Sequence, residues 1–273
     1  MKAAPRRFLS IFTLVSRIPL AIPFEPDYSR ADFWLPLVGV FPAAFALVGA
    51  FLGSALFGSP AFVALLSVLV QYAAFNLFHF DGLLDSADAM LPMATPERRL
   101  EILKDSRIGS YAFFVGSIYL GLRLAALAEL AGDGGLFGGR AGSLFPPRLI
   151  AALLAAPVAG GAASALIPRI AVPARPRGLG ALMKGFSSAR LGLGFALGLV
   201  PLAAWGLLAG RAGLALESAA VAAAAALLAG LYFARLYSRK AGGFTGDALG
   251  AASELAELLC LLAAAALARA AGD

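Results

Sequence analysis

The sequence predicts an all-α, polytopic integral membrane protein: a helical bundle with about seven transmembrane helices in one domain, residues 1–273. The chain is 60% hydrophobic and only 14% charged, with a mean hydropathy of +0.85. Its apolar residues form continuous runs close to the roughly 20 residues that a membrane-crossing helix needs, without the period-two alternation of a β-barrel. The single cysteine, Cys260, excludes an intrachain disulfide framework and a cysteine metal site.

The N-terminal segment precedes the first long apolar run. Residues 1–23 combine basic residues with a short apolar stretch, which resembles a signal peptide. Arg17 and Pro19 interrupt that stretch. We therefore expect residues 1–32 to form an uncleaved amphipathic or interfacial segment.

Seven apolar runs are expected to cross the membrane, at about 33–57, 61–80, 109–131, 149–168, 191–210, 214–234 and 249–268. Pro36 and Pro42 predict a kink in the first run. Pro157 and the glycine pair 160–161 predict a break in the fourth and are expected to permit close helix contact. The glycine-rich stretch 130–147 is expected to be a loop.

Positive charge is distributed unevenly between the two sides of this predicted topology. With the N-terminus inside, residues 1–32, 81–108, 169–190 and 235–248 contain 17 of the 22 Lys and Arg residues. This distribution satisfies the positive-inside rule and accounts for the net charge of +6 without a nucleic-acid partner. We expect a multi-pass protein of the cell (inner) membrane with the lipid bilayer as partner. A homo-oligomer is left open.

The stretch that follows the second run carries the first candidate site. Asp81, Asp85 and Asp88 have i, i+4, i+7 spacing, which places them within about 60° on one helical face. A hard cation offsets such like charges, and Mg²⁺ commonly bridges carboxylates to a substrate phosphate. We expect these aspartates to bind Mg²⁺. The alternative is a solvated acidic face at the membrane surface.

Three further residues near this cluster are candidate catalytic groups. His79, the only histidine, has two open roles: a general base, or a structural hydrogen-bonding group at the end of the run. Lys104 and Arg107 follow in the 81–108 segment. They are expected to supply positive charge to a phosphate in the transition state.

A second acidic motif lies near the C-terminus, at residues 241–257. Asp247 and Glu254 are seven residues apart and share a helical face, and Glu257 lies roughly 80° away. We expect Asp247 and Glu254 to be further Mg²⁺ ligands, although a first-turn aspartate often only compensates the helix dipole. Backbone N–H groups near Gly246 are expected to bind phosphate.

The predicted topology places both acidic motifs on the cytoplasmic face. We therefore expect the second and seventh spans to pack side by side around a shared cavity, with Gly250 permitting close approach. Arg123 lies in the middle of the third run, where a charge needs a partner. Its expected partner is Glu129 or a carboxylate of another span.

Three motifs carry a resemblance to a known family. Residues 79–88 (HFDGLLDSAD), 99–109 (RLEILKDSRIG) and 243–257 (GFTGDALGAASELAE) resemble the adenosylcobinamide-GDP ribazoletransferase family, also called cobalamin 5′-phosphate synthase. Two positions depart from the family pattern: Ala89 replaces a usual glycine, and residues 160–161 replace a Ser-Arg pair with two glycines. The remaining motif members expected to bind substrate are Glu101, Asp105, Ser106 and Glu257.

The resemblance implies that a hydroxyl of α-ribazole, or of its 5′-phosphate, attacks the cobinamide-side phosphorus of adenosylcobinamide-GDP and releases GMP. A CDP-alcohol phosphotransferase is the enzymatic alternative, although its DGxxAR motif is not matched after Asp81-Gly82. An ion-coupled transporter is the non-enzymatic alternative. The sequence contains no Walker A motif, which disfavours a P-loop triphosphatase.

Overall fold

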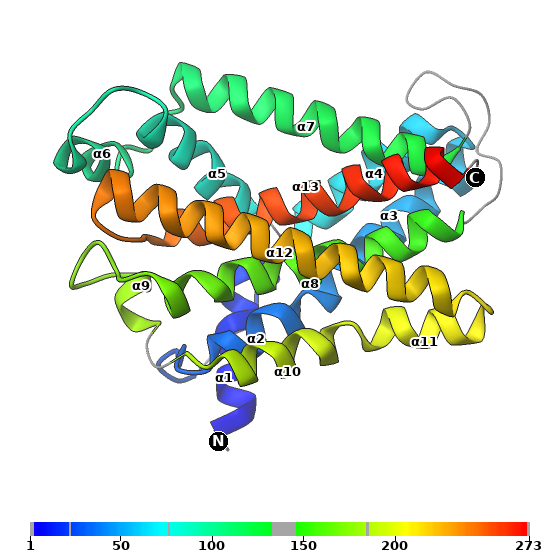
Figure 1. Ribbon diagram of the computed structural model, residues 1–273, viewed down its shortest axis with the longest axis horizontal. Coiled ribbons are helices and arrows are strands. Elements are labelled where there is room, and N and C mark those ends of the chain that lie inside the picture. Colours follow the sequence, from blue (N-terminus) through cyan, green and yellow to red (C-terminus); the bar gives the residue numbers. More distant parts are fainter. Residues whose placement is uncertain (1–2, 22, 76, 133–145, 184–185, 272–273) are drawn as a thin grey trace.

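The computed structural model describes residues 3–21, 23–75, 77–132, 146–183 and 186–271. Within these ranges the protein is a bundle of helices, and six helical segments are long and apolar enough to cross a membrane (Figure 1). A shorter apolar helix, Pro60–Ala74, completes the bundle. In chain order the helices are α1 (Ala3–Val15), α2 (Ala31–Val38), α3 (Val40–Phe57), α4 (Pro60–Ala74), α5 (Leu77–Met90), α6 (Pro96–Ile102), α7 (Ser110–Ala131), α8 (Pro147–Ile170), α9 (Leu179–Leu182), α10 (Ser188–Gly198), α11 (Val200–Leu208), α12 (Ala212–Ala241) and α13 (Gly246–Ala271).

The expected kink in the first span is confirmed. The segment Ala31–Phe57 is divided at Gly39, where α2 ends and α3 begins. Pro36 lies inside α2 and cannot donate the backbone hydrogen bond that an uninterrupted helix needs. A Cβ atom on Gly39 would lie 2.6 Å from the carbonyl oxygen of Pro157, so the division also permits backbone contact with α8.

The prediction of one continuous second span at 61–80 is wrong. Helix α4 ends at Ala74, Phe75 is extended, and α5 begins at Leu77. The N-terminal segment lies against this break, because the Arg17 N–H donates to the Ala74 carbonyl at 2.7 Å. The sequence did not show the break because neither proline nor glycine marks it.

The predicted break in the fourth span is also wrong, since α8 runs unbroken from Pro147 to Ile170 with Pro157 inside it. Neighbouring helices enclose α8, and such packing supports a helix that contains proline. The close helix contact expected at the glycine pair is confirmed. A Cβ on Gly160 would lie 2.6 Å from Ser253 Oγ, and one on Gly161 would lie 2.3 Å from the Leu35 carbonyl. Most of the expected 130–147 loop, residues 133–145, lies outside the described residues.

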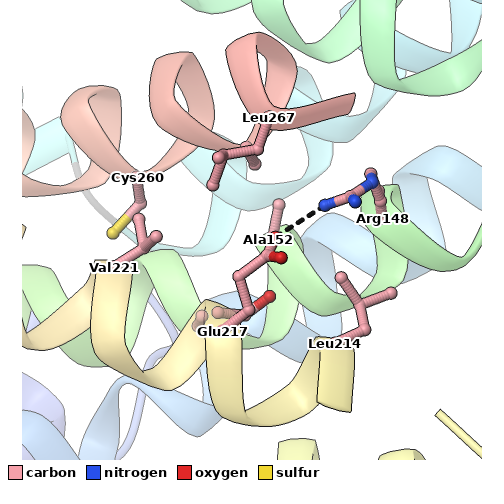
Figure 2. Close-up of a pocket in the computed structure, with 10 residues that line it drawn as sticks. Arg148, Ala152, Leu214, Glu217, Val221, Cys260 and Leu267 are labelled. Carbon is pink, nitrogen blue, oxygen red and sulfur yellow. Dashed lines mark hydrogen bonds and ion pairs between the residues drawn. The ribbon is translucent and has the colours of Figure 1, made fainter. Parts of the chain in front are cut away.

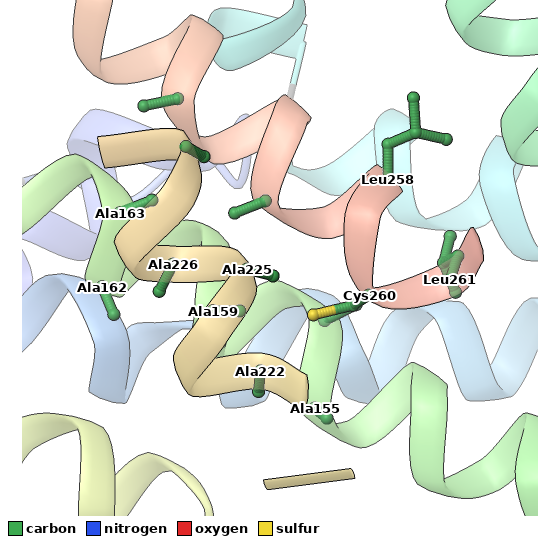
Figure 3. Packing of buried hydrophobic residues seen from close by; sticks show 14 of the residues in the cluster. Ala155, Ala159, Ala162, Ala163, Ala222, Ala225, Ala226, Leu258, Cys260 and Leu261 are labelled. Carbon is green, nitrogen blue, oxygen red and sulfur yellow. The ribbon is translucent and has the colours of Figure 1, made fainter. Parts of the chain in front are cut away.

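Small side chains form the core between α8, α12 and α13 (Figure 3). Large apolar side chains such as Phe113, Leu207 and Leu216 are instead exposed on the outside of the bundle. This arrangement suits a lipid environment, where close van der Waals packing rather than exclusion from water drives helix association. The buried small residues include Ala155, Ala159, Ala162, Ala163, Ala222, Ala225, Ala226 and Cys260.

Helix α1 packs across the bundle rather than along it (Figure 1). Its buried side includes Ile11 and Phe12, and the ring of Phe12 meets the ring of Phe75 edge-on beside the α4–α5 break. Arg7 pairs with Asp27 at 3.1 Å, which fixes the chain that follows α1. The amphipathic character expected of residues 1–32 is thus present, with its apolar side on the bundle.

Candidate functional site

Helices α5 and α13 bring the two acidic motifs together. A Cβ on Gly82 would lie 2.9 Å from the Asp247 carbonyl oxygen, and one on Gly250 would lie 2.8 Å from the His79 carbonyl oxygen. Backbone therefore touches backbone at two points, one on each side of the crossing. The expected packing of the two motif regions is confirmed, with α5 in the position expected for the end of the second span, whereas the shared cavity stays a prediction.

Asp85 lies at the centre of the carboxylates. Burial raises its pKa to about 7, and the charges of Asp81, Asp247 and Asp88, in that order of size, add to the effect. Four carboxylates from two helices thus interact with one another, and a bound cation would relieve their repulsion. Carboxylate oxygens are the donors that Mg²⁺ prefers, so the residue types fit this ion.

The carboxylates are not arranged as a finished coordination shell. In the part of the chain that the structure describes, no three His, Cys, Asp or Glu side chains form a group that could hold a metal ion. Asp81 is exposed, whereas Thr245 Oγ1 donates to Asp247 Oδ2 at 2.9 Å. Metal binding at this site therefore requires the carboxylates to change rotamer.

Asp88 has a structural role that its spacing did not reveal. Its carboxylate accepts hydrogen bonds from the Gly109 N–H at 2.7 Å and the Ala112 N–H at 2.9 Å, at the N-terminus of α7. It caps α7 from another helix and carries the charge that a helix N-terminus favours. A Cβ on Gly109 would lie 2.6 Å from this carboxylate, which explains the need for glycine there.

Glu254 and Glu257 lie in a separate buried network. Arg123 Nη2 lies 2.7 Å from Glu257 Oε2, and Arg123 Nη1 lies 3.5 Å from Glu254 Oε2. The hydroxyls of Tyr72 and Tyr119 donate to Glu254. These contacts join α4, α7 and α13. We therefore leave Glu254 out of the proposed metal site and Glu257 out of the proposed substrate site.

The partner expected for Arg123 is thus a carboxylate of another span. Glu129, the other candidate, pairs with Arg269 at 2.8 Å.

The remaining residues predicted to act at the site lie at the surface, in the last turn of α6 and in the connection from α6 to α7. The side chain of Arg107 is 87% exposed and pairs with Asp105 at 2.6 Å. Hydrogen bonds from the side chain and the backbone N–H of Arg107 lower the pKa of Asp105 to about 2. Glu101 pairs with Arg98 at 2.9 Å, and Lys104 and Ser106 are exposed. The contact of Asp88 with Gly109 fixes the end of this connection beside α5, but Arg107 contacts Asp105 rather than the clustered aspartates.

Three further cations lie around α5 and α6. Arg99 donates to the Ala89 carbonyl at 2.5 Å, and Lys240 donates to the Met90 carbonyl at 2.6 Å. Both stabilise the C-terminus of α5, where the helix dipole favours positive charge. The third is Arg175, which donates to the Leu100 carbonyl and interacts electrostatically with Asp247.

The surroundings of His79 favour its structural role. His79 Nδ1 is buried without a hydrogen-bond partner in the structure. His79 lines a cavity of about 20 Å³ whose wall is mostly apolar but also includes Ser253 and Glu257. A space of this size can hold one water molecule, and a water bound between these polar groups would satisfy Nδ1.

Another pocket lies at the far end of the bundle, between α8, α12 and α13 (Figure 2). Arg148 Nη1 pairs with Glu217 Oε1 at 2.6 Å, and the remaining lining is mostly apolar, including Leu214, Val221 and Cys260. None of the residues expected to act in catalysis lines this pocket.

Comparisons with known proteins find relatives that match almost the whole chain. The chain is 35% identical to the adenosylcobinamide-GDP ribazoletransferase of Bradyrhizobium diazoefficiens, over 95% of this chain and 90% of the relative. It is 33% identical to the enzyme of that name from Escherichia coli O17:K52:H18, over 94% and 98%. No solved structure matches the chain. The family model described as cobalamin-5-phosphate synthase matches residues 7–265, and this chain belongs to that family.

Proposed function

We propose that this chain is an adenosylcobinamide-GDP ribazoletransferase that uses Mg²⁺. It joins α-ribazole, or α-ribazole 5′-phosphate, to adenosylcobinamide-GDP and releases GMP, giving adenosylcobalamin or its 5′-phosphate. This is the last assembly step of cobalamin biosynthesis. The observation that carries the proposal is the contact of Gly82 with the Asp247 backbone, which joins the family's first and last motifs at one site.

The reaction forms one P–O bond and breaks another. A hydroxyl oxygen of the ribazole attacks the cobinamide-side phosphorus, and the bond from that phosphorus to the bridging oxygen breaks. GMP leaves with the bonding electron pair. The hydroxyl proton passes to solvent water as the new P–O bond forms.

Asp81, Asp85 and Asp247 are the residues proposed to hold Mg²⁺, with Asp88 adjoining them from its capping position. When bound, the ion would neutralise charge on the diphosphate. Lys104 and Arg107 would approach the phosphates from the α6–α7 connection once Arg107 exchanges Asp105 for substrate. Backbone N–H groups at Gly246, the first residue of α13, are proposed to contribute as well.

We also propose that the site faces the cytoplasm from the cell (inner) membrane. Three of the basic segments, 81–108, 169–190 and 235–248, lie toward the end of the bundle that carries α5, α6 and α9 (Figure 1).

Release of GMP by the purified protein in detergent tests the proposal. Adenosylcobinamide-GDP is supplied with either α-ribazole or its 5′-phosphate, with Mg²⁺ or with EDTA, and GMP is quantified by chromatography. We expect GMP only with an acceptor and Mg²⁺ present. Turnover unaffected by EDTA overturns the metal assignment, and no GMP with either acceptor overturns the function. A CDP-alcohol supplied in place of adenosylcobinamide-GDP serves as the substrate control.

A further inference from the structure

Arg175 lies in the α8–α9 connection and interacts electrostatically with Asp247. Two backbone hydrogen bonds hold this connection against the residues before α13: Ala174 N–H to the Phe244 carbonyl, and Phe244 N–H to the Val172 carbonyl, both 2.9 Å. Gly243 makes this pairing possible, because a Cβ there would lie 2.5 Å from the Val172 carbonyl oxygen. Arg175 is therefore fixed to the same short segment that begins α13.

The guanidinium of Arg175 uses only some of its N–H hydrogen-bond donors. Arg175 is half-buried, its Nη2 donates to the Leu100 carbonyl, and its charge interacts with that of Asp247. Among the ion pairs of the described residues, none within 4.0 Å involves Arg175. Since a guanidinium carries five N–H donors, most of them remain available.

The other nearby cations are more fully engaged. Arg99 donates to two backbone carbonyls, Ala89 at 2.5 Å and Pro92 at 2.9 Å. Arg107 forms its bidentate contact with Asp105, and Arg98 pairs with Glu101. Arg175 is thus the cation that combines proximity to Asp247 with unused donors.

We propose that Arg175 binds the phosphate of the GMP half of the substrate diphosphate, opposite the carboxylates. An arginine suits this task because its planar fork can donate two parallel hydrogen bonds to phosphate oxygens. The hydrogen bond to Leu100 restrains the side chain before substrate binds, which reduces the entropy lost on binding. This inference rests on the proposed function and adds a substrate-binding residue to it.

The test compares Arg175→Ala, Arg175→Lys and Arg175→Gln with Arg177→Ala in purified protein. Arg177 lies two residues further on in the same connection and is exposed, so it is the matched control. Two quantities are measured: steady-state GMP release, and binding of radiolabelled GMP at equilibrium without turnover. Restoration of turnover by millimolar guanidinium is measured as well.

Arg175→Ala is expected to lower kcat/KM and GMP affinity by about 100-fold, as for a lost charge-assisted contact, and guanidinium should restore part of the turnover. Arg175→Lys should retain more affinity than Arg175→Gln, which keeps a donor for Leu100 but not the charge. Arg177→Ala should stay within about twofold of the unmodified protein.

Two results overturn the proposal. One is GMP affinity in Arg175→Ala equal to that of Arg177→Ala. The other is lower abundance or Tm with unchanged turnover per molecule, which would make Arg175 only an anchor for α6. If Arg175→Ala does not fold, equal GMP affinity of the Lys and Gln variants overturns the proposal instead. Failure of the unmodified protein to release GMP refutes the proposed function separately, because equilibrium GMP binding is measured independently of turnover.

Discussion

Gly82 of α5 and Asp247 of α13 meet with no room for a side chain between them. A Cβ on Gly82 would lie 2.9 Å from the Asp247 carbonyl oxygen and 3.1 Å from its Cα. The neighbour is backbone rather than a flexible side chain, so it cannot yield without moving α13. The separation of Asp85 from Asp247 therefore depends on this glycine together with Gly250.

Gly82→Ala is expected to lower turnover at least tenfold while the protein still inserts and purifies. Alanine favours a helix by about 1 kcal/mol over glycine, so any loss comes from the contact with Asp247. Gly121→Ala is the control, because a Cβ there meets nothing within 4 Å and the residue lies in α7. GMP release and Tm are measured for both. Equal turnover of the two variants would show that α5 and α13 need not touch for catalysis.

Asp85 predicts a pH-dependent requirement for Mg²⁺. Its pKa is raised to about 7, mainly by burial and then by the neighbouring carboxylates, so a proton competes with the cation as pH falls below 7. The Mg²⁺ concentration for half-maximal turnover should rise from pH 8 to pH 6. In Asp85→Asn, turnover should be abolished at limiting Mg²⁺. Normal activity of that variant at limiting Mg²⁺ would exclude Asp85 as a ligand.

The same group predicts how the stability of the metal-free protein depends on pH. In the folded state Asp85 keeps its proton up to about pH 7, whereas in the unfolded state it loses the proton near its ordinary pKa of 3.8. The folded state therefore binds more protons between these values, and Tm in EDTA should fall as pH rises from about 5 to 8. Asp85→Asn should flatten this dependence. A Tm that rises over this range would contradict the assignment.

Two variants of Asp88 can distinguish its capping role from metal binding. Asp88→Ala removes both acceptors at the start of α7 and is expected to cost about 0.5–2 kcal/mol of stability. Asp88→Asn keeps one acceptor oxygen and should be closer to the unmodified protein in Tm. If Asp88 also binds Mg²⁺, the Asn variant loses turnover despite its stability. Full turnover in Asp88→Asn would leave the cap as its only role.

Six of the seven spans expected from the sequence correspond to helical segments long and apolar enough to cross a membrane, because long apolar runs determine them, whereas the second corresponds to the shorter α4. The sequence also predicted the meeting of α5 and α13, since the charge distribution put both motifs on one side and Gly250 marked a close approach. It could not show the break at Phe75, where neither proline nor glycine marks the end of α4 and Arg17 supplies a hydrogen-bond donor from another segment. Nor could the sequence show that Glu254 lies in a different environment from Asp247. Helical periodicity gives the angle between two side chains around one helix, but not the neighbouring helices that each one contacts.

In the buried network around Arg123, loss of the arginine is expected to lower the free energy of unfolding more than loss of one glutamate. One arginine lies against two buried carboxylates, Glu254 and Glu257, so removing the arginine leaves unpaired negative charge within the bundle. Breaking a buried pair in this way costs about 3–5 kcal/mol. Arg123→Gln should therefore destabilise strongly, whereas Glu257→Gln should cost less, because Arg123 retains Glu254.

A double-mutant cycle measures this coupling. Arg123→Gln, Glu257→Gln and the double variant are unfolded in mixed micelles, and the free energies of unfolding are compared. The double variant should be more stable than Arg123→Gln alone, because it removes one of the two uncompensated charges. Arg269→Gln is the control: its pair with Glu129 is 78% exposed on the arginine side and should contribute at most about 1 kcal/mol. Strict additivity in the Arg123–Glu257 cycle would mean that the two side chains do not stabilise one another, and that α7 and α13 are held together by packing alone.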